Sequence, residues 1–467
     1  MNTRMENDLL GAMEVPADAY YGIHSLRAKY NFRVSELTIH SELIRALAEV
    51  KKACALANHR TGNLDQTIAD AICAAAEEIA CGKLHDQFII DALQGGAGTS
   101  ANMNANEVIA NRAIEILGGA KGDYDLVHPL DHVNLSQSTN DVFPTAVRIA
   151  AIRLLLPAIQ SMAHLQKALQ VKENEFAGVL KIGRTEMQDA VPITLGQEFS
   201  AWAQAVQRDW WRLYKVEERL RQVNLGGTAV GTGLNADRDY IYIVVDILRE
   251  ITNLPLARAE NMIDVTQNCD IFVEVSGLIK AAAVNLAKIA ADLRLLSSGP
   301  RAGIGEINLP ELQAGSSIMP GKVNPVATEA VSQAAFQIMA NDQAITLAAM
   351  NGQLELNAFL PIIAHNLFES LQLLSNAADL LAEKCVRGIT ANEERCRELV
   401  ENSFAVLTAI SPYIGYDAAS NIAHEAVSTG KTIRQVVLER GLFTKEKLDV
   451  ILSTVEMTKP GIAGLDQ

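Results

Sequence analysis

The stretch DVFPTAVRIAAIRLLLPAIQSMAHLQKALQV, residues 141–171, indicates the fold class. It is rich in alanine and larger apolar residues, and it contains no glycine. Four further apolar-rich segments follow it, at 196–223, 268–297, 326–350 and 356–388. With a rise of about 1.5 Å per residue, a helix of about 30 residues reaches about 45 Å, which is typical of a helical bundle. We therefore predict a mainly α fold with a long central helical bundle.

The length of the chain predicts more than one domain. A chain of 467 residues is too long for one ordinary core, and no linker rich in serine, glycine or proline divides it. We expect a mainly helical N-terminal domain at 1–140, the central long-helix bundle at 141–394 and a small helical C-terminal domain at 395–467. The long segments are so apolar that we expect burial against other subunits, with cover by the terminal domains as the alternative.

Local signals place the shorter elements. Periodic apolar residues predict helices at 41–58 and 65–80, and alternating residues at 32–37 predict a short strand or hairpin. A threonine three positions before Glu or Gln predicts a capping box, in which the two side chains bind each other's backbone N–H groups. We expect such boxes at Thr194–Gln197, Thr390–Glu393 and Thr432–Gln435.

The composition excludes several classes of partner. The formal net charge is −15 and no block of Lys or Arg occurs, so we expect neither nucleic acid nor an anionic membrane as a partner. The six cysteines form no C-x-x-C pair, which favours reduced thiols in a cytoplasmic protein over disulfides or a zinc site. The first ten residues contain no apolar run behind basic residues, so we expect neither a signal peptide nor a membrane span.

A loop at 315–325, GSSIMPGKVNP, combines two hydroxyls, a lysine and an amide with glycines and prolines. It is interpreted as a mobile loop with stiff joints that carries chemistry, although a plain surface turn favours the same residue types. It is not a phosphate-binding loop, because five residues separate Gly315 from Gly321 and Val323 replaces the Ser or Thr that holds magnesium.

Two predicted helix starts carry hydroxyl residues. In QGGAGTS, residues 94–100, Thr99 or Ser100 is expected to be the N-cap of a helix that runs to about residue 117. In SQSTND, residues 136–141, the following Pro144 is tolerated only if a helix starts close by. Free N–H groups at such helix starts favour carboxylates, although simple capping is the commoner role of each hydroxyl residue taken alone.

The loop at 315–325 resembles the signature G-S-S-x-M-P-x-K-x-N-P of the fumarase/aspartase superfamily, with every fixed position present. The resemblance spans essentially the whole chain, and the versions of several motifs are most similar to the aspartase branch. The motifs that carry it are DLLG (8–11), VPADAYYG (15–22), GGAGTS (95–100) with NMN (102–104), SQSTND (136–141), GRT (183–185), GTGLN (231–235) and LPELQA (309–314).

The resemblance implies a three-domain lyase that reversibly deaminates L-aspartate to fumarate and ammonia by anti-elimination through an aci-carboxylate. Ser316 is then expected to be the general base. The expected partners of the carboxylate beside the acidic carbon are Thr99, Ser138, Thr139 and Ser317. The other carboxylate is expected at Thr185, Lys322 and Asn324, and the amino group at Asn140. Hydration of fumarate to malate and a non-catalytic structural protein of the same fold are the alternatives.

The resemblance also implies an assembly. It predicts a homotetramer whose core pools the long helices, with sites built from several chains, a small dicarboxylate as substrate and no organic cofactor. We see no cluster of His, Asp or Cys that predicts a dedicated metal site.

One position departs from the family pattern. Many relatives carry His or Gln directly after the Gly-Arg-Thr unit, whereas this chain has Glu186. We expect Glu186 to lie near the substrate ammonium, where its charge favours an amine over a neutral hydroxyl. The alternative is an outward-facing Glu186 paired with Arg184.

Overall fold

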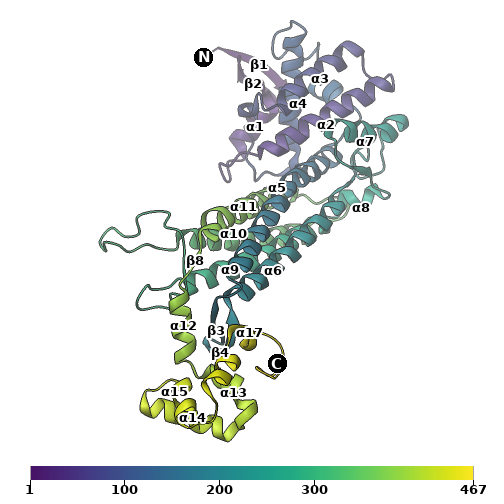
Figure 1. Cartoon of the computed structure of the whole chain (residues 1–467). Coiled ribbons are helices and arrows are strands. Elements are labelled where there is room, and N and C mark those ends of the chain that lie inside the picture. The colour runs from purple at the N-terminus through teal and green to yellow at the C-terminus, as the bar shows by residue number, and fades with distance from the viewer. Residues whose placement is uncertain (1, 466–467) are drawn as a thin grey trace. The chain divides into compact units, whose positions relative to one another are not determined.

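The structure is a computed structural model that describes residues 2–465, and it consists mainly of α-helices (Figure 1). Its strands form only two-stranded sheets. The predicted mainly α fold is confirmed.

The chain divides into two compact units, and each is assembled from separate segments. The first unit comprises residues 1–159, 211–283 and 336–375, of which residue 1 is not described. The second comprises residues 160–210, 284–335 and 376–467, described to residue 465. The three consecutive domains expected from the sequence stay a prediction.

Five long helices correspond to the five apolar segments. They are α5 (Thr139–Glu175), α6 (Leu195–Val216), α9 (Asp270–Leu296), α10 (Val326–Met350) and α11 (Leu360–Leu380). Pro144 falls in the first turns of α5, as expected, and Pro157 lies further along the same helix. The capping box at Thr194–Gln197 is confirmed, with both hydrogen bonds at 3.0 Å. By length and composition α5 is able to cross a membrane, but 72% of its apolar window is buried within the protein, the pattern of a core helix.

The first unit also contains shorter helices and strands. They are β1 (Thr3–Asp8), β2 (Gly11–Pro16), α1 (Ile23–Asn31), α2 (Ser41–Arg60), α3 (Gln66–Ala80), α4 (Thr99–Ile116), β5 (Gln222–Val223), α7 (Arg238–Thr252), β6 (Ala257–Arg258) and α8 (Met262–Gln267). The helices predicted at 41–58 and 65–80 are confirmed. The strand predicted at 32–37 is wrong, because the N-terminal hairpin is formed by β1 and β2 instead.

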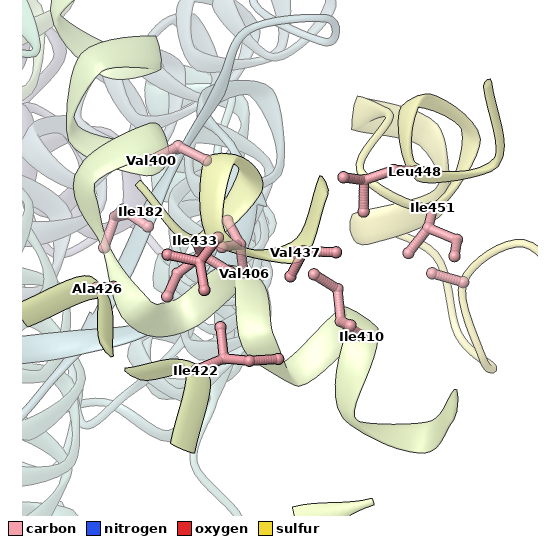
Figure 2. Close-up of a cluster of buried hydrophobic side chains, with 12 residues drawn as sticks. Ile182, Val400, Val406, Ile410, Ile422, Ala426, Ile433, Val437, Leu448 and Ile451 are labelled. Atoms are coloured by element: carbon pink, nitrogen blue, oxygen red, sulfur yellow. The ribbon is translucent and has the colours of Figure 1, made fainter. Parts of the chain in front are cut away.

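The second unit combines a hairpin with a group of short helices. Its elements are β3 (Leu180–Thr185), β4 (Gln188–Thr194), β7 (Ile307–Asn308), β8 (Thr390–Ala391), α12 (Glu393–Asn402), α13 (Leu407–Ile414), α14 (Tyr416–Thr429), α15 (Ile433–Glu439), α16 (Lys445–Ile451) and α17 (Thr454–Met457). Ile182 of β3 lies in one apolar cluster with residues of the short helices, among them Val400, Ile422 and Ile433 (Figure 2). This cluster packs β3 against the short helices.

Two capping predictions in this unit have opposite outcomes. The box at Thr432–Gln435 is confirmed at the start of α15. The box at Thr390–Glu393 is wrong, because Thr390 pairs with Asn308 in the β7–β8 ladder and Asn392 becomes the N-cap of α12. A tertiary strand pairing therefore overrides the local signal.

Candidate active site

The start of α4 differs from the expected hydroxyl cap. Its N-cap is Gly98, with φ +96°, and the Gln94 side chain accepts the hydrogen bond from the Ala101 N–H at 2.9 Å. A Cβ at Gly98 would lie 2.5 Å from the Phe143 ring, so only glycine fits here. Thr99 is the first residue of the helix and is exposed, and its hydroxyl donates to the Gly96 carbonyl at 2.6 Å. The N-cap prediction for Thr99 or Ser100 is wrong, yet Thr99 still stands at a helix N-terminus.

The start of α5 is closed by a reciprocal pair of hydrogen bonds. The Ser138 hydroxyl accepts from the Asn140 N–H at 3.2 Å, and the Asp141 carboxylate accepts from the Ser138 N–H at 2.9 Å. Asp141 is fully buried, and burial raises its pKa to about 6. Ser138, Thr139 and Asn140 are half-buried in this first turn.

Asp141 also binds a loop that comes from far along the chain. Its carboxylate accepts hydrogen bonds from the backbone N–H groups of Gly226 at 3.0 Å and Thr228 at 3.1 Å. Asn140 donates through Nδ2 to the Ala229 carbonyl at 2.7 Å, which leaves its Oδ1 as an acceptor for a cation such as ammonium. The loop at 224–235 therefore fixes the orientation of Asn140.

The N-termini of α4 and α5 are neighbours within the first unit. Gly98 packs against Phe143, and Asn102 of α4 donates to the Thr139 hydroxyl oxygen at 3.1 Å. Two helix N-termini that lie together present free N–H groups, hydroxyls and dipole ends of one sign, which favours a carboxylate. The structure thus brings together the regions of Thr99, Ser138, Thr139 and Asn140.

The loop at 315–325, in the second unit, is closed at its neck. A Cβ at Gly315 would lie 1.8 Å from the Lys322 carbonyl oxygen, so the two ends of the loop approach each other closely at a position where only glycine fits. Asn324 donates through Nδ2 to the Gly315 carbonyl at 2.9 Å. The expected role of Asn324 in seating a carboxylate therefore falls to the second N–H of its Nδ2 or to an exchange of this hydrogen bond.

Ser316 lies just inside this neck. Its hydroxyl oxygen accepts hydrogen bonds from the backbone N–H groups of Ile318 at 3.2 Å and Met319 at 3.0 Å. Donors that converge on one oxygen stabilise negative charge on it. Ser317 and Lys322 are exposed, and the Lys322 ammonium has no ion pair within residues 2–465. The loop therefore already supplies two donors to the oxygen of Ser316.

Thr185 and Glu186 lie at the exposed tip of the β3–β4 hairpin. Glu186, with φ +52°, and Met187, with φ +65°, form its two-residue turn. Such a turn favours Asn and Gly, because positive φ is costly for residues with a Cβ, and backbone strain of this kind clusters at functional sites. A Cβ at Gly183 would lie 2.6 Å from the Val191 carbonyl oxygen, which explains the glycine at the bulge below the tip.

Four buried or half-buried charged side chains lie together beside β3: Lys181 and Arg184 of the strand itself, and Glu198 and Glu306. Arg184 donates to both carboxylate oxygens of Glu306, at 2.9 and 3.0 Å. The buried Lys181 ammonium lies 3.3 Å from Glu306 and 3.2 Å from Glu198. The pairing of Glu186 with Arg184 in the alternative is wrong, because Arg184 is bound to Glu306 instead. The outward-facing orientation of Glu186 in that alternative agrees with its exposed position in the chain.

Two family profiles match the chain. One, described as Lyase, matches residues 11–340, and the other, described as Fumarase C C-terminus, matches residues 406–459. An aspartate ammonia-lyase from Bacillus subtilis is 52% identical over 461 residues, which cover 99% of this chain and 97% of the relative. The chain belongs to the aspartase family of lyases. The resemblance drawn from the sequence motifs is confirmed.

Solved structures agree with this aspartase-family assignment. A fumarate lyase:delta crystallin from Brucella melitensis, bound to cobalt, is 49% identical with a TM-score of 0.95, and the match covers 98% of this chain and all of the other. A class II fumarase from Schistosoma mansoni is 36% identical with a TM-score of 0.94 over the same shares. The fold is therefore common to both branches of the superfamily.

The aspartase-family site regions occupy both units. Thr99, Ser138, Thr139 and Asn140 belong to the first unit, and Thr185, Glu186 and the loop at 315–325 belong to the second. Residues 2–465 contain no group of three or more His, Cys, Asp or Glu side chains placed to hold a metal ion.

Three buried charged residues of this aspartase-family chain are not among the site residues predicted from the sequence: Lys51, Asp141 and Glu306. A signal for Lys51 existed, because it lies four residues after Leu47 and three before Cys54, on the apolar face of α2. Glu306 had no such signal, because its partners Lys181 and Arg184 lie more than a hundred residues earlier in the chain.

Proposed function

We propose that the protein catalyses the reversible anti-elimination of ammonia from L-aspartate to give fumarate, with the Ser316 oxygen as the base that removes the Cβ proton. Serine is a weak acid in water, so its alkoxide needs strong local stabilisation. The observation that carries the proposal is the pair of backbone N–H groups, from Ile318 and Met319, that already bind this oxygen. The aspartase-family relatives extend over the whole chain and support aspartate as substrate.

The developing aci-carboxylate needs donors whose hydrogen bonds strengthen as its charge grows. The N-termini of α4 and α5 offer these donors through Thr99, Ser138 and Thr139, and Ser317 adds a hydroxyl from the loop. The other carboxylate is assigned to Thr185, Lys322 and Asn324. The amino group is assigned to the Oδ1 of Asn140, whose orientation the Ala229 hydrogen bond fixes.

Closure of the loop at 315–325 completes the site in this proposal. The side chain of Ile318 is 82% exposed and that of Met319 is 46% exposed, although both are apolar. Burial of these two side chains on closure lowers the free energy through the hydrophobic effect. Closure also excludes water, which strengthens the hydrogen bonds to the Ser316 oxygen.

An absorbance assay for fumarate tests the proposal. The purified protein should form fumarate from L-aspartate and not from L-malate at comparable concentration. Fumarate from malate alone would establish the hydratase alternative, which the more distant Schistosoma mansoni fumarase represents among the relatives. No fumarate from either substrate would establish the structural alternative, against which the intact Ser316, Lys322 and Asn324 argue.

We further propose a cytoplasmic homotetramer with shared sites. Phe336, Leu347 and Met350 lie on one face of α10 and are 60%, 50% and 71% exposed. Exposed apolar stripes of this kind favour burial against another subunit. All six cysteines are free thiols, which supports a reducing compartment.

Mixing two inactive variants should restore activity if sites are shared. In a Ser316→Ala protein mixed equally with a Thr185→Val protein, about a quarter of the sites receive both intact residues, so about a quarter of wild-type activity should return. Absorbance at the fumarate band measures the recovery, and mass spectrometry shows subunit exchange. If mixed tetramers form without any recovery, Ser316 and Thr185 act from the same chain.

Glu186→Gln tests the choice of amine over hydroxyl. If the Glu186 charge attracts the substrate ammonium, this variant should lower kcat/KM for aspartate at least about tenfold, which corresponds to about 1.4 kcal/mol. Glu36→Gln is a matched control, because Glu36 is an exposed glutamate with positive φ that belongs to the first unit and to none of the assigned site regions. Equal kinetics in both variants would mean that the charge of Glu186 plays no part in selecting the substrate.

A further inference from the structure

A fully buried lysine lies behind the start of α5. Lys51 of α2 has no exposed surface, and no carboxylate lies within ion-pair distance of its ammonium in residues 2–465. Its Nζ donates instead to the Oδ1 of Asn134 at 2.9 Å and to the Oε1 of Gln137 at 2.8 Å. A buried charge with only amide partners is costly, so its retention favours a role beyond packing.

Lys51 determines which way two side-chain amides face. A lysine ammonium only donates, so the amide atoms that face it must be the oxygens. The amide nitrogens then point the other way, and they do so with partners: Asn134 Nδ2 donates to the Gln137 carbonyl at 3.2 Å, and Gln137 Nε2 donates to the Val133 carbonyl at 2.9 Å. The turn before Ser138 is thereby ordered around one ammonium.

The Oδ1 of Asn134, once oriented by Lys51, determines how the side-chain amides of Asn102 and Asn106 face. It also accepts hydrogen bonds from the Nδ2 atoms of Asn102 and Asn106, each at 3.2 Å. The buried Oδ1 atoms of Asn102 and Asn106 have no hydrogen-bond partner among the described residues. Both asparagines therefore keep their nitrogens toward Asn134 at the cost of an unsatisfied oxygen, and such an arrangement calls for an explanation.

The network ends at Thr139. Asn102 Nδ2 donates to the Thr139 hydroxyl oxygen at 3.1 Å. A hydroxyl whose oxygen already accepts from a protein group has its own O–H free to donate in another direction. The donor chain from Lys51 through Asn134 and Asn102 therefore makes Thr139 a donor at the site.

We propose that Lys51 is a positioning residue that, through Asn134 and Asn102, directs the Thr139 O–H toward the substrate carboxylate and places a buried positive charge behind it. The proposal rests on the proposed function, because that function assigns the carboxylate to Thr139. Lys51 itself does not touch the substrate.

The charge of Lys51 varies near neutral pH. Burial lowers its pKa to about 7. Cys54 on α2 and Asp141 on α5 act on this ammonium. Burial raises the pKa of Cys54 to about 12, and the pKa of its partner Tyr240 on α7 lies well above the usual range, so both stay neutral. Asp141, with a pKa of about 6, is the one group of these that ionises nearby.

The remaining charged groups on neighbouring elements have other partners. On α3, Glu77 forms an ion pair with Lys52. On α4, Glu107 accepts from backbone N–H groups at the start of α1, for example from that of Ser25 at 3.1 Å. In the π-helical turn at 129–133, His132 accepts through Nδ1 from the His128 N–H at 2.9 Å.

The affinity for a dianion should fall as the pH rises through the pKa of Lys51. Lys51 is charged below pH about 7 and neutral above it, so a bound dianion loses one favourable charge as the pH rises through this value. The neutral amine keeps two N–H groups for Asn134 and Gln137, so the orientation of the network persists.

The experiment measures fumarate binding by calorimetry in ammonia-free buffer, where no deamination equilibrium operates. Lys51→Met should weaken binding at least about tenfold at about pH 5.5 and by a smaller factor at about pH 8.5, because wild-type Lys51 is itself neutral at the higher pH. At about pH 8.5 Asp141 is ionised in both proteins, whereas at about pH 5.5 it is mostly protonated in the wild type and more so in Lys51→Met, because the Lys51 charge lowers its pKa. Lys52→Met, which changes the neighbouring surface lysine, is the matched control and should bind like wild type.

A double-mutant cycle separates positioning from general packing. If Lys51 acts through Thr139, adding Lys51→Met to Thr139→Val should weaken binding at about pH 8.5 far less than it does in the wild-type background. Additive losses, or a Lys51→Met protein with wild-type affinity, would overturn the proposal. If Lys51→Met does not fold, Asn102→Leu interrupts the same chain and should show the same non-additivity with Thr139→Val.

Binding and turnover are read separately in this design. A wild-type protein that binds fumarate but forms no fumarate from aspartate would contradict the proposed function. In that case the double-mutant cycle of Lys51→Met and Thr139→Val would still test the role of Lys51. Normal deamination together with additive losses contradicts the role of Lys51 alone.

Discussion

Ser316→Ala should lower kcat for aspartate deamination by about 10²–10⁴-fold, because it removes the base that takes the Cβ proton. Fumarate binding should change little, since the serine oxygen acts on the transition state more than on the ground state. Stopped-flow or steady-state absorbance of fumarate measures the first quantity, and calorimetry measures the second. The two backbone donors of Ile318 and Met319 remain in this variant but have no oxygen to stabilise.

Ser317→Ala is the matched control for this variant. It removes a neighbouring hydroxyl of the same loop but leaves the base in place, so it should lower kcat less than Ser316→Ala does. Exchange of the aspartate Cβ proton with deuterated solvent gives an independent readout, because it requires the base but not product release. Near-normal turnover or exchange in Ser316→Ala would assign the base to another residue.

Glu306→Ala should destabilise the protein by about 3–5 kcal/mol, because it leaves the buried Lys181 and the Arg184 guanidinium without their shared carboxylate. Arg184 directly precedes Thr185, so the tip of the hairpin should lose its position and kcat/KM should fall as well. Denaturant unfolding at one fixed protein concentration measures the stability, since assembly itself contributes to it.

Two variants give the scale for this result. Glu383→Ala removes the partner of Arg387 in an exposed ion pair and should cost about 1 kcal/mol or less. Glu198→Gln should also cost less than Glu306→Ala, because burial already raises the pKa of Glu198 and Lys181 keeps Glu306 as a partner. A Glu306→Ala protein as stable as Glu383→Ala would show that the buried charges are screened by water.

Local sequence patterns were sufficient for the long helices. Apolar periodicity places α5 and α10 within a few residues of their observed ends, because burial of one continuous face dominates over so many turns. The capping boxes at Thr194 and Thr432 also follow from local chemistry, since all their partners lie within three residues.

Two capping predictions are wrong because contacts between distant segments override the local sequence signal. Thr390 has the capping signal, but the ladder with Asn308 fixes its backbone first. Thr99 has the N-cap chemistry, but Gly98 occupies that position because Phe143 leaves no room for a Cβ. The site residues assigned by family resemblance stay predictions, while their placement at two adjoining helix starts, a closed loop and a strained hairpin is what the structure adds.

The closed neck of the loop at 315–325 has a consequence for the speed of closure. Gly315 and Asn324 join the ends of the loop when the protein folds, so the entropy of bringing these ends together is lost once and not in every catalytic cycle. In the closure proposed above, residues 315–324 would move as one preformed ring on the segments that flank the neck. Substitutions between Ile318 and Gly321 should therefore change the contacts that the closed loop makes. Substitutions outside the neck should instead change the rate of closure.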